Sequence, residues 1–271
     1  MSMTSPAEPT QPAPAAAEPD GAPLLEVVEI TKAFGGLIAL SDVSITVPPL
    51  AVYSVIGPNG SGKTTLLNIV NGVLRPTAGG IKLRGRPIER MKPHERAKLG
   101  IARTFQHPRA FGGMTVLDNV RVGDHVSGDR RVRLTARHAH EEEEARRMLD
   151  IVQLPRRKEL LRVPSLSLRE QRAVELARAL MMQPQLLLMD EPVSGMDPAE
   201  RPAWIRYIRE VQTSLGLTVV LVEHSMKVVA EISDWVVVLS SGHVLTQGTA
   251  DEVLNDPRVR SVYIGRGTKN A

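Results

Sequence analysis

Short hydrophobic runs bounded by turn residues recur along the chain, and they predict buried strands. The clearest runs are 24–30, 38–47, 52–56, 185–189 and 217–222. Most of them are rich in valine, isoleucine and leucine, as strands covered on both faces of a sheet usually are. Shorter strands are expected at 81–85 and 101–106, and a terminal hairpin at 236–239 and 244–246. These elements predict an α/β protein.

Helical segments are expected between the strands. Positions 66–70 have the apolar spacing of a helix, 93–99 predict a short helix, and 134–154 predict a charged helical region. From residue 107 to about 180 the pattern departs from that of a sheet, which predicts a helical insertion. Asp197 is the expected N-cap of a later helix, because Pro198 suits the first helical position and Glu200 lies three residues past the cap. A short C-terminal helix should follow the hairpin.

A glycine-rich stretch between the strand at 52–56 and the helix at 66–70 fits the phosphate-binding pattern GxxxxGKT. Glycines let the backbone turn tightly, so that successive N–H groups point at phosphate oxygens beside the positive end of the helix dipole. Lys63 is expected to contact the β and γ phosphates, and the Thr64 hydroxyl to ligate Mg²⁺. The predicted phosphate-binding residues are Gly57, Pro58, Asn59, Gly60, Ser61, Gly62, Lys63, Thr64 and Thr65.

Polar residues end two of the buried strands. The strand at 185–189 is followed by Asp190 and Glu191, and the strand at 217–222 by Glu223 and His224. Parallel strands deliver such groups to the carboxyl edge of the sheet, where open α/β proteins bind ligands. We therefore expect Asp190 to hold Mg²⁺, Glu191 to orient or deprotonate an attacking water, and His224 to sense the γ-phosphate.

Phe34 lies before Gly35 and Gly36, upstream of the phosphate-binding stretch. On a turn there, its ring is expected to stack on adenine. The other interpretation of Phe34 is a phenylalanine of the core.

Composition narrows the class of protein. The chain has 271 residues with 42% hydrophobic content, enough for a full core, and the absence of cysteine excludes disulfides and thiolate zinc sites. The formal charge is +4, with two tryptophans, three tyrosines and three phenylalanines. So few aromatic residues do not suit single-strand nucleic-acid binding, and we expect no nucleic-acid partner. No apolar run approaches the ~20 residues of a membrane helix, and the N-terminus lacks the features of a secretion signal.

Two regions are assigned no catalytic or ligand-binding role. Residues 1–23 contain six prolines and almost no large apolar group, which predicts a disordered tail before a domain at 24–271. In the insertion, a basic cluster at 130–137 and an acidic run at 141–144 favour a solvated helix. His138 and His140 are two residues apart and do not share a helical face, so no metal is assigned to them.

In combination, these motifs resemble the ATP-binding subunits of ABC transporters, over about residues 24–265. The resemblance implies a P-loop NTPase with a RecA-like core sheet, an antiparallel β subdomain and an inserted helical subdomain at about 107–180. It also implies ATP and Mg²⁺ as cofactors, Gln106 as a link from Mg²⁺ and water to the membrane partner, and Asp197 at the dimer interface. The implied partners are permease subunits, a second ATP-binding subunit and a solute-binding protein. The resemblance also implies that this subunit lies peripherally at the cytoplasmic face of the cell membrane.

A narrower resemblance is to the larger ATPase subunit of branched-chain amino-acid importers. Four segments carry it: Gly35-Gly36-Leu37, Arg103-Thr104-Phe105-Gln106-His107, Met114-Thr115-Val116 and Val262-Tyr263-Ile264-Gly265. The resemblance implies import of a small solute.

The chain departs from the family at its signature, Leu-Ser-Gly-Gly-Gln-Gln-Arg, where residues 166–172 read Leu-Ser-Leu-Arg-Glu-Gln-Arg. Ser167 is the implied γ-phosphate contact across the dimer, and both glycines are absent. Ser167 and Glu170 also have the spacing of a capping box, whose demand for the serine would compete with phosphate. The alternative function is therefore an ABC-type ATPase that mainly binds ATP in a regulatory or asymmetric dimer.

Overall fold

The computed structural model describes residues 22–106, 108–124 and 134–264, and of residues 134–139 and 264 it describes the backbone alone. The predicted N-terminal tail lies outside the described residues except for Ala22 and Pro23. Most of the basic cluster of the insertion, the side chain of His138, and His107 and Gly265 also lie outside them.

A sheet of six strands forms the centre of the described structure, in the order β10-β9-β3-β8-β7-β6. All neighbouring strands in it are parallel except β9 and β10, which form the predicted hairpin. The strands β3, β7 and β8 are buried at every position, as expected for aliphatic runs between two covering layers. The strand bounds are β3 (Val52–Ile56), β6 (Ile101–Arg103), β7 (Leu186–Asp190), β8 (Thr218–Val222), β9 (Trp235–Ser240) and β10 (His243–Gly248).

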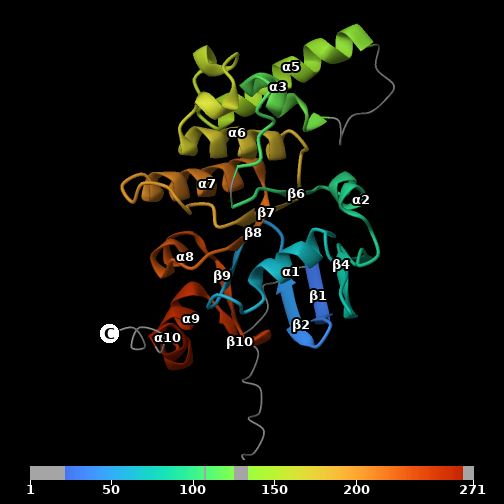
Figure 1. The fold of residues 1–271 in the computed structure, drawn as a ribbon, viewed down its shortest axis with the longest axis vertical. Helices are drawn as coiled ribbons and strands as arrows, with labels where there is room; N and C mark the ends of the chain where they lie inside the picture. The colour runs from blue at the N-terminus through green and yellow to red at the C-terminus, as the bar shows by residue number, and fades with distance from the viewer. Residues whose placement is uncertain (1–21, 107, 125–133, 265–271) are drawn as a thin grey trace, which may run out of the picture.

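A second, antiparallel sheet has the order β2-β1-β4-β5 and lies beside α1 (Figure 1). Its strands are β1 (Leu25–Phe34), β2 (Leu37–Val47), β4 (Ala78–Leu83) and β5 (Arg86–Pro87). The strand β1 is longer than the hydrophobic run that predicted it. Backbone pairing with β2 continues to Phe34↔Leu37, so the turn consists of Gly35 and Gly36 alone.

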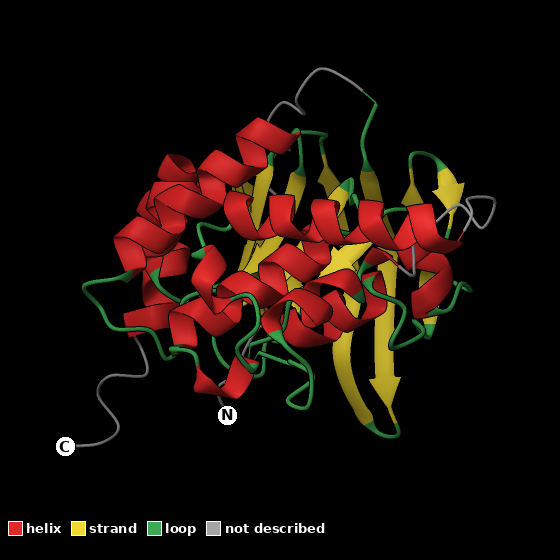
Figure 2. Cartoon of the chain, turned by 90° about the horizontal axis from the view of Figure 1, so that it is seen from above, coloured by secondary structure: helices red, strands yellow, loops and turns green. Residues whose placement is uncertain are grey.

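Helices cover the sheets and form a separate upper layer (Figure 1). Seen from above, this helical layer lies in front of the strands (Figure 2). It contains α3 (Val116–Arg121), α5 (Leu134–Ile151) and α6 (Leu168–Leu180). One buried apolar cluster includes residues of these helices and of β7 and β8, so the helical part and the central sheet share a core. The division into subdomains stays a prediction.

The remaining helices are α1 (Lys63–Val70), α2 (Pro93–Lys98), α7 (Arg201–Leu215), α8 (Met226–Ile232), α9 (Ala250–Asn255) and α10 (Pro257–Ile264). The expectation of one C-terminal helix is wrong, because α9 and α10 are separated at Asp256. This residue is extended, with ψ 122°. A residue before proline is pushed away from helical angles, and Pro257 follows directly. None of the described helices combines the length and apolar character needed to span a membrane.

The predicted helix start at Asp197 is also wrong. The helix α7 begins at Arg201, with Glu200 as its uncapped N-cap residue. Asp197 instead accepts a hydrogen bond from the N–H of Ala199 at 2.8 Å, and Glu200 donates to the Asp197 carbonyl at 2.9 Å. Asp and Asn side chains can close a local turn in this way, in competition with helix capping. The aspartate therefore forms a separate turn just before the helix.

Candidate functional site

The predicted phosphate-binding loop connects β3 to α1, as the sequence indicates. Gly62 precedes α1 with φ 104°, and no side chain caps the helix, so its first N–H groups point into the loop without a side-chain acceptor. The backbone of the loop is packed closely against its neighbours. A Cβ atom on Gly57 would lie 2.1 Å from the Leu239 carbonyl oxygen, and one on Gly62 would lie 2.7 Å from the Ala39 carbonyl oxygen. Both glycines are therefore required sterically.

A cavity of about 300 Å³ opens at this loop. The Lys63 ammonium donates to the carbonyl oxygens of Gly57 at 2.8 Å and Pro58 at 3.0 Å. Burial lowers the pKa of Lys63, and the charges of Glu191 and Asp190 act in the opposite direction. Ser61 Oγ is buried and has no hydrogen-bond partner among the described residues. A buried cation and an unpaired hydroxyl in a loop of backbone N–H groups fit a polyphosphate. The lining residues are Ala39, Asn59, Gly60, Gly62, Lys63, Thr64, Thr65 and Glu191.

The donor set beside the loop fits Mg²⁺ bound together with phosphate. Thr64 is exposed and lines the cavity, whereas Asp190 is buried at the end of β7. Within the described part of the chain, no group of three or more His, Cys, Asp or Glu side chains could hold a metal by itself. Mg²⁺ usually takes one or two protein ligands and completes its shell with substrate phosphates and water. A hydroxyl and a carboxylate are consistent with that arrangement.

Glu191 contacts both of the other predicted catalytic residues, Gln106 and His224. Its Oε2 atom accepts a hydrogen bond from Gln106 Nε2 at 2.5 Å and lies 3.3 Å from His224 Nε2. The sequence predicts a strand that continues to Gln106, but β6 ends at Arg103. Gln106 therefore lies in a loop. Glu191 has φ 48°, a conformation that non-glycine residues rarely adopt, as it turns out of β7. Glu191 and His224 lie at one edge of the sheet, as predicted, and Gln106 contacts Glu191 there.

Glu223 fixes the backbone that carries His224. Its Oε2 atom accepts the N–H groups of His224 at 2.9 Å and Ser225 at 3.2 Å. The side chain is buried, and burial raises its pKa. The sequence interpretation gave Glu223 no role, although its position between a buried strand and the histidine was visible.

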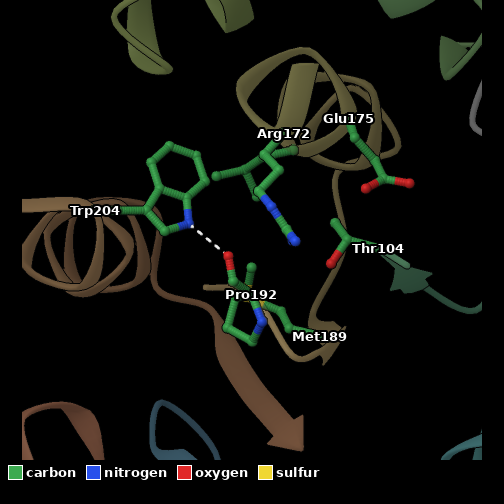
Figure 3. Close-up of a pocket in the computed structure, with 7 residues that line it drawn as sticks. Thr104, Arg172, Glu175, Met189, Pro192 and Trp204 are labelled. Atoms are coloured by element: carbon green, nitrogen blue, oxygen red, sulfur yellow. Dashed lines mark hydrogen bonds between the residues drawn. The ribbon is translucent and has the colours of Figure 1, made fainter. Parts of the chain in front are cut away.

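Arg172 extends from α6 into a region beside Trp204 and Pro192 (Figure 3). Its hydrogen bonds hold α6, the Gln106 loop and the segment 191–194 together. Its Nη2 atom donates to the carbonyl oxygens of Gln106 at 2.9 Å and of Ser194, and its Nη1 atom donates to that of Glu191 at 3.4 Å. Trp204 supports the same region by donating from Nε1 to the Pro192 carbonyl at 3.1 Å. The sequence interpretation did not single out Arg172, but it occupies the last position of the signature.

Phe34, Asp197 and Ser167 are among the predicted site residues that do not line the cavity. Phe34 is 44% exposed at the end of β1, which argues against the core interpretation, and Lys32 Nζ lies 4.8 Å from its ring centroid. Asp197 closes the turn before α7. Ser167 is exposed at the start of α6, in the helical layer away from α1 (Figure 1). The roles of these residues stay predictions.

The predicted capping box at the signature is confirmed. Ser167 Oγ accepts the N–H of Glu170 at 3.4 Å, and a Glu170 carboxylate oxygen accepts the N–H of Ser167 at 3.1 Å. The other oxygen of Glu170 pairs with Lys158 Nζ at 2.5 Å. This ion pair is the main reason why the pKa of Glu170 is lowered. The negative charge at the signature is thus compensated locally.

We predict that Arg172→Met lowers the free energy of unfolding by about 1–3 kcal/mol, since three carbonyl groups lose a charged donor in a buried place. The corresponding fall in melting temperature is about 2–10 °C and is measured by calorimetry or circular dichroism. Arg147→Met is the control. Arg147 is 62% exposed, with an ion pair to Glu144 at 3.3 Å, and its loss should shift the midpoint by about 1 °C or less. Equal shifts in the two variants would contradict the bridging role of Arg172.

Two family models match the chain. The model described as ABC transporter matches residues 40–194, more than half of the chain. The model described as branched-chain amino acid ATP-binding cassette transporter matches residues 243–268, from β10 onward. The matches confirm both resemblances on which the sequence interpretation depended.

Relatives and a solved structure agree with these models. The chain is 36% identical over 251 residues to the high-affinity branched-chain amino acid transport ATP-binding protein LivG of Salmonella typhimurium, covering 90% of this chain and 98% of that protein. The same values hold for the protein of that description named BraF in Pseudomonas aeruginosa. A crystal structure of a nucleotide-free ATP-binding cassette from an ABC transporter superposes with a TM-score of 0.80 at 31% identity, covering 90% of this chain and 99% of that one. The predicted fold class is therefore confirmed, and the chain belongs to the ATP-binding subunits of the ABC transporter family.

Proposed function

We propose that this chain binds Mg·ATP at residues 57–65, hydrolyses it with Glu191 as general base, and thereby energises import of branched-chain amino acids through a membrane permease. The observation that carries the proposal is the contact of Glu191 with both Gln106 and His224 at the mouth of the Lys63 cavity. A carboxylate placed beside a phosphate-binding loop is suited to accept a proton from an attacking water.

Different residues would bind the phosphates and the metal ion. Backbone N–H groups and Lys63 would hold the phosphates, and Thr64, Asp190 and Gln106 would hold the metal ion. When bound, Mg²⁺ neutralises the phosphate oxygens on which negative charge develops. Glu191 takes the proton of the water at its carboxylate, while His224 and Gln106 fix the orientation of that carboxylate. Phe34 offers its exposed ring face to adenine.

The transported solute is inferred from the C-terminal part of the chain. The ABC transporter model covers residues 40–194, which contain the ATP-binding machinery common to many transporters. The model that matches residues 243–268 is described as a branched-chain amino acid ATP-binding cassette transporter, and LivG and BraF are described as branched-chain amino acid transport proteins. This region therefore favours branched-chain amino acids over other small solutes.

A groove of about 480 Å³ beside the Gln106 loop is a suitable docking surface for a permease segment. Its lining is apolar and basic, with the Arg109 guanidinium 4.4 Å from the Phe105 ring centroid. No ion pair of Arg109 with an acidic side chain is found within the described ranges. We infer that the permease segment brings a carboxylate to Arg109. The lining residues are Arg103, Phe105, Arg109, Ala110, Phe111, Val122, Gly123, Arg178, Ala179 and Met182.

The remaining partners follow from the same function. Ser167 and Asp197 lie outside the cavity formed by the loop of their own chain, which is expected if they act across a dimer with a second ATP-binding subunit. A solute-binding protein would deliver the amino acid on the opposite side of the membrane, and this subunit would associate peripherally with the cytoplasmic face.

The alternative, a regulatory or asymmetric ATP-binding protein, is not favoured. The family matches describe transport proteins, and the charge of Glu170 at the altered signature is neutralised by Lys158.

Purification from membranes tests the whole proposal. The chain should co-purify with permease subunits, and the complex in lipid vesicles should hydrolyse ATP faster when leucine, isoleucine or valine and the solute-binding protein are present. Stimulation by an unrelated solute such as sulfate, and not by these amino acids, would overturn the assignment of the substrate while leaving the ATPase intact.

We predict that Lys63→Ala weakens ATP binding by at least about tenfold, because it removes a buried cation from the phosphate loop. Equilibrium binding of a fluorescent ATP analogue measures the loss. Lys227→Ala is the control, since Lys227 is exposed on α8 and does not line the cavity. Unchanged affinity in Lys63→Ala would show that nucleotide binds elsewhere.

We predict that Glu191→Gln preserves ATP affinity and lowers kcat by about 10²-fold or more, because the amide keeps the shape of the side chain and cannot accept a proton. Steady-state hydrolysis and size-exclusion chromatography with ATP measure the two effects, and ATP-bound dimers should accumulate. Wild-type turnover in this variant would exclude Glu191 as the base.

We predict that Leu168→Gly with Arg169→Gly raises the ATPase rate of the isolated protein severalfold at constant ATP affinity. Glycine at these positions opens the backbone N–H groups at the start of α6 to the γ-phosphate. Arg169→Lys, which keeps the charge and the bulk, should leave the rate near that of the wild type. A double variant that folds normally but hydrolyses ATP no faster would identify Arg169 as a working phosphate ligand.

A further inference from the structure

The side chain of Arg103 joins the end of β6 to the predicted Mg²⁺ ligand. Its Nη2 atom lies 3.0 Å from Asp190 Oδ2, and its Nη1 atom donates to Asn68 Oδ1, on α1, at 2.6 Å. Both charged side chains are nearly buried, with 6% exposure for Arg103 and 10% for Asp190. One guanidinium thus connects the strand that ends in Asp190 with the helix that follows the phosphate loop.

This pairing has a strong electrostatic basis. Burial lowers the pKa of Arg103, while the charge and hydrogen bond of Asp190 oppose that shift. A buried ion pair of this kind is costly to break from one side, because the remaining charge is left in a poorly solvated place. The contact uses Asp190 Oδ2 and not Oδ1, so a metal ion could bind through Oδ1. Arg103 is therefore placed to orient Asp190 and does not displace a metal ion from it.

Arg103 also lines the groove beside the Gln106 loop. The Arg103 guanidinium carbon lies 5.0 Å from the Phe105 ring centroid, and both residues line the groove. A guanidinium that stacks on an aromatic ring is restricted in its position. A displacement of the Phe105 ring would therefore shift the Arg103 guanidinium. The same side chain is in contact with the groove and with the metal ligand.

We propose that Arg103 is a positioning residue for Asp190, through which the occupant of the groove acts on the Mg²⁺ site. The proposal rests on the role proposed above for Asp190 as a Mg²⁺ ligand. Residues that orient a metal ligand typically contribute 10–100-fold to metal affinity, which gives the expected size of the effect. This connection is separate from the Gln106 contact, because it passes through Asp190 and not through Glu191.

Binding of a fluorescent ATP analogue to the full chain, titrated with Mg²⁺, tests the proposal without measuring hydrolysis. In Arg103→Met the Mg²⁺ concentration required for half-maximal strengthening of binding should rise about 10–100-fold. Binding of the analogue in EDTA should equal that of the wild type, because Arg103 does not line the phosphate cavity. An unchanged Mg²⁺ requirement overturns the proposal.

Arg209→Met is the matched control for loss of an Arg–Asp pair. Arg209 binds Asp234 through two contacts, at 2.6 and 2.7 Å, and the pair lies at the opposite end of β3, where Asp234 Oδ2 also accepts the Val52 N–H at 2.8 Å. This variant should lose stability but keep the wild-type Mg²⁺ requirement. An equal rise in both variants would mean that general destabilisation causes the effect, and it would overturn the proposal.

If Arg103→Met does not fold, Arg103→Lys is measured in its place. Lysine keeps the positive charge but cannot hold Asp190 and Asn68 with one planar group, so a smaller rise in the Mg²⁺ requirement is expected. A folded Arg103→Lys with wild-type Mg²⁺ dependence also overturns the proposal.

A double-mutant cycle tests the part played by the groove. Phe105→Leu should raise the Mg²⁺ requirement in the same direction, and the double variant with Arg103→Met should show less than the product of the two single effects. Full independence of the two substitutions would overturn the link to the groove.

Asp190→Asn separates this inference from the proposed function. If Asp190→Asn raises the Mg²⁺ requirement and Arg103→Met does not, Asp190 is a ligand and Arg103 does not position it. If Asp190→Asn leaves the Mg²⁺ requirement unchanged, the proposed metal site itself is wrong.

Discussion

The parallel register of β7, β8 and β3 is the constraint on which the site depends. Val222 pairs with Asp190 on one side and with Val55 on the other, so the three strands end at nearly the same level. The phosphate loop, Glu191 and the Glu223–His224 segment therefore leave the sheet side by side. A parallel sheet also places the helix that follows each strand on a covering layer, which keeps this edge open to ligands. Shifting β7 by one residue would turn Asp190 to the opposite face of the sheet and separate it from the phosphate loop.

The same convergence creates an electrostatic problem, because it brings carboxylates together in a partly buried place. Cations and backbone donors offset this repulsion. Arg103 pairs with Asp190, and the N–H groups of His224 and Ser225 bind Glu223. Lys63 donates to the loop carbonyls and interacts with the charges of the acids. Glu223 Oε1 is buried without a hydrogen-bond partner among the described residues, so the compensation is incomplete, and burial raises the pKa of Glu223. Glu191 is different, because its carboxylate is contacted by the amide of Gln106 and the imidazole of His224 and not by a guanidinium. The acid proposed for proton transfer is thus held by an amide and an imidazole, and the acid proposed for the metal by a buried ion pair.

The features set by local sequence were predictable. The apolar runs gave the positions of β3, β7 and β8, the glycine pattern gave the phosphate loop, and the spacing of Ser167 and Glu170 gave the cap of α6. One error, the expectation of a single C-terminal helix, overlooked a local signal at Pro257. The others occurred where two local patterns compete or where long-range pairing decides. Asp197 satisfies the rules for a helix cap and for an aspartate turn, and the turn forms. The extension of β1 to Phe34 depends on pairing with β2. The contacts of Arg172 and Arg103 join segments far apart in the sequence, so no pattern of nearby residues indicates them.

Arg103 and Gln106 are three residues apart at the end of β6, and they contact two consecutive carboxylates, Asp190 and Glu191. Glu191 turns out of the strand with a positive φ, so its side chain points in a different direction from that of Asp190. The Arg103–Asp190 and Gln106–Glu191 contacts are therefore separate from each other. Arg172 binds the carbonyl oxygens of both Gln106 and Glu191, so the backbone between these contacts is fixed to α6 and the helical layer. A displacement of the helical layer would therefore be transmitted to the base through the Gln106 backbone. A displacement of the groove wall would reach the metal ligand through Phe105 and Arg103. In the proposed mechanism hydrolysis requires both carboxylates in place, so a partner that contacts the groove and the helical layer together would act on the reaction at two points.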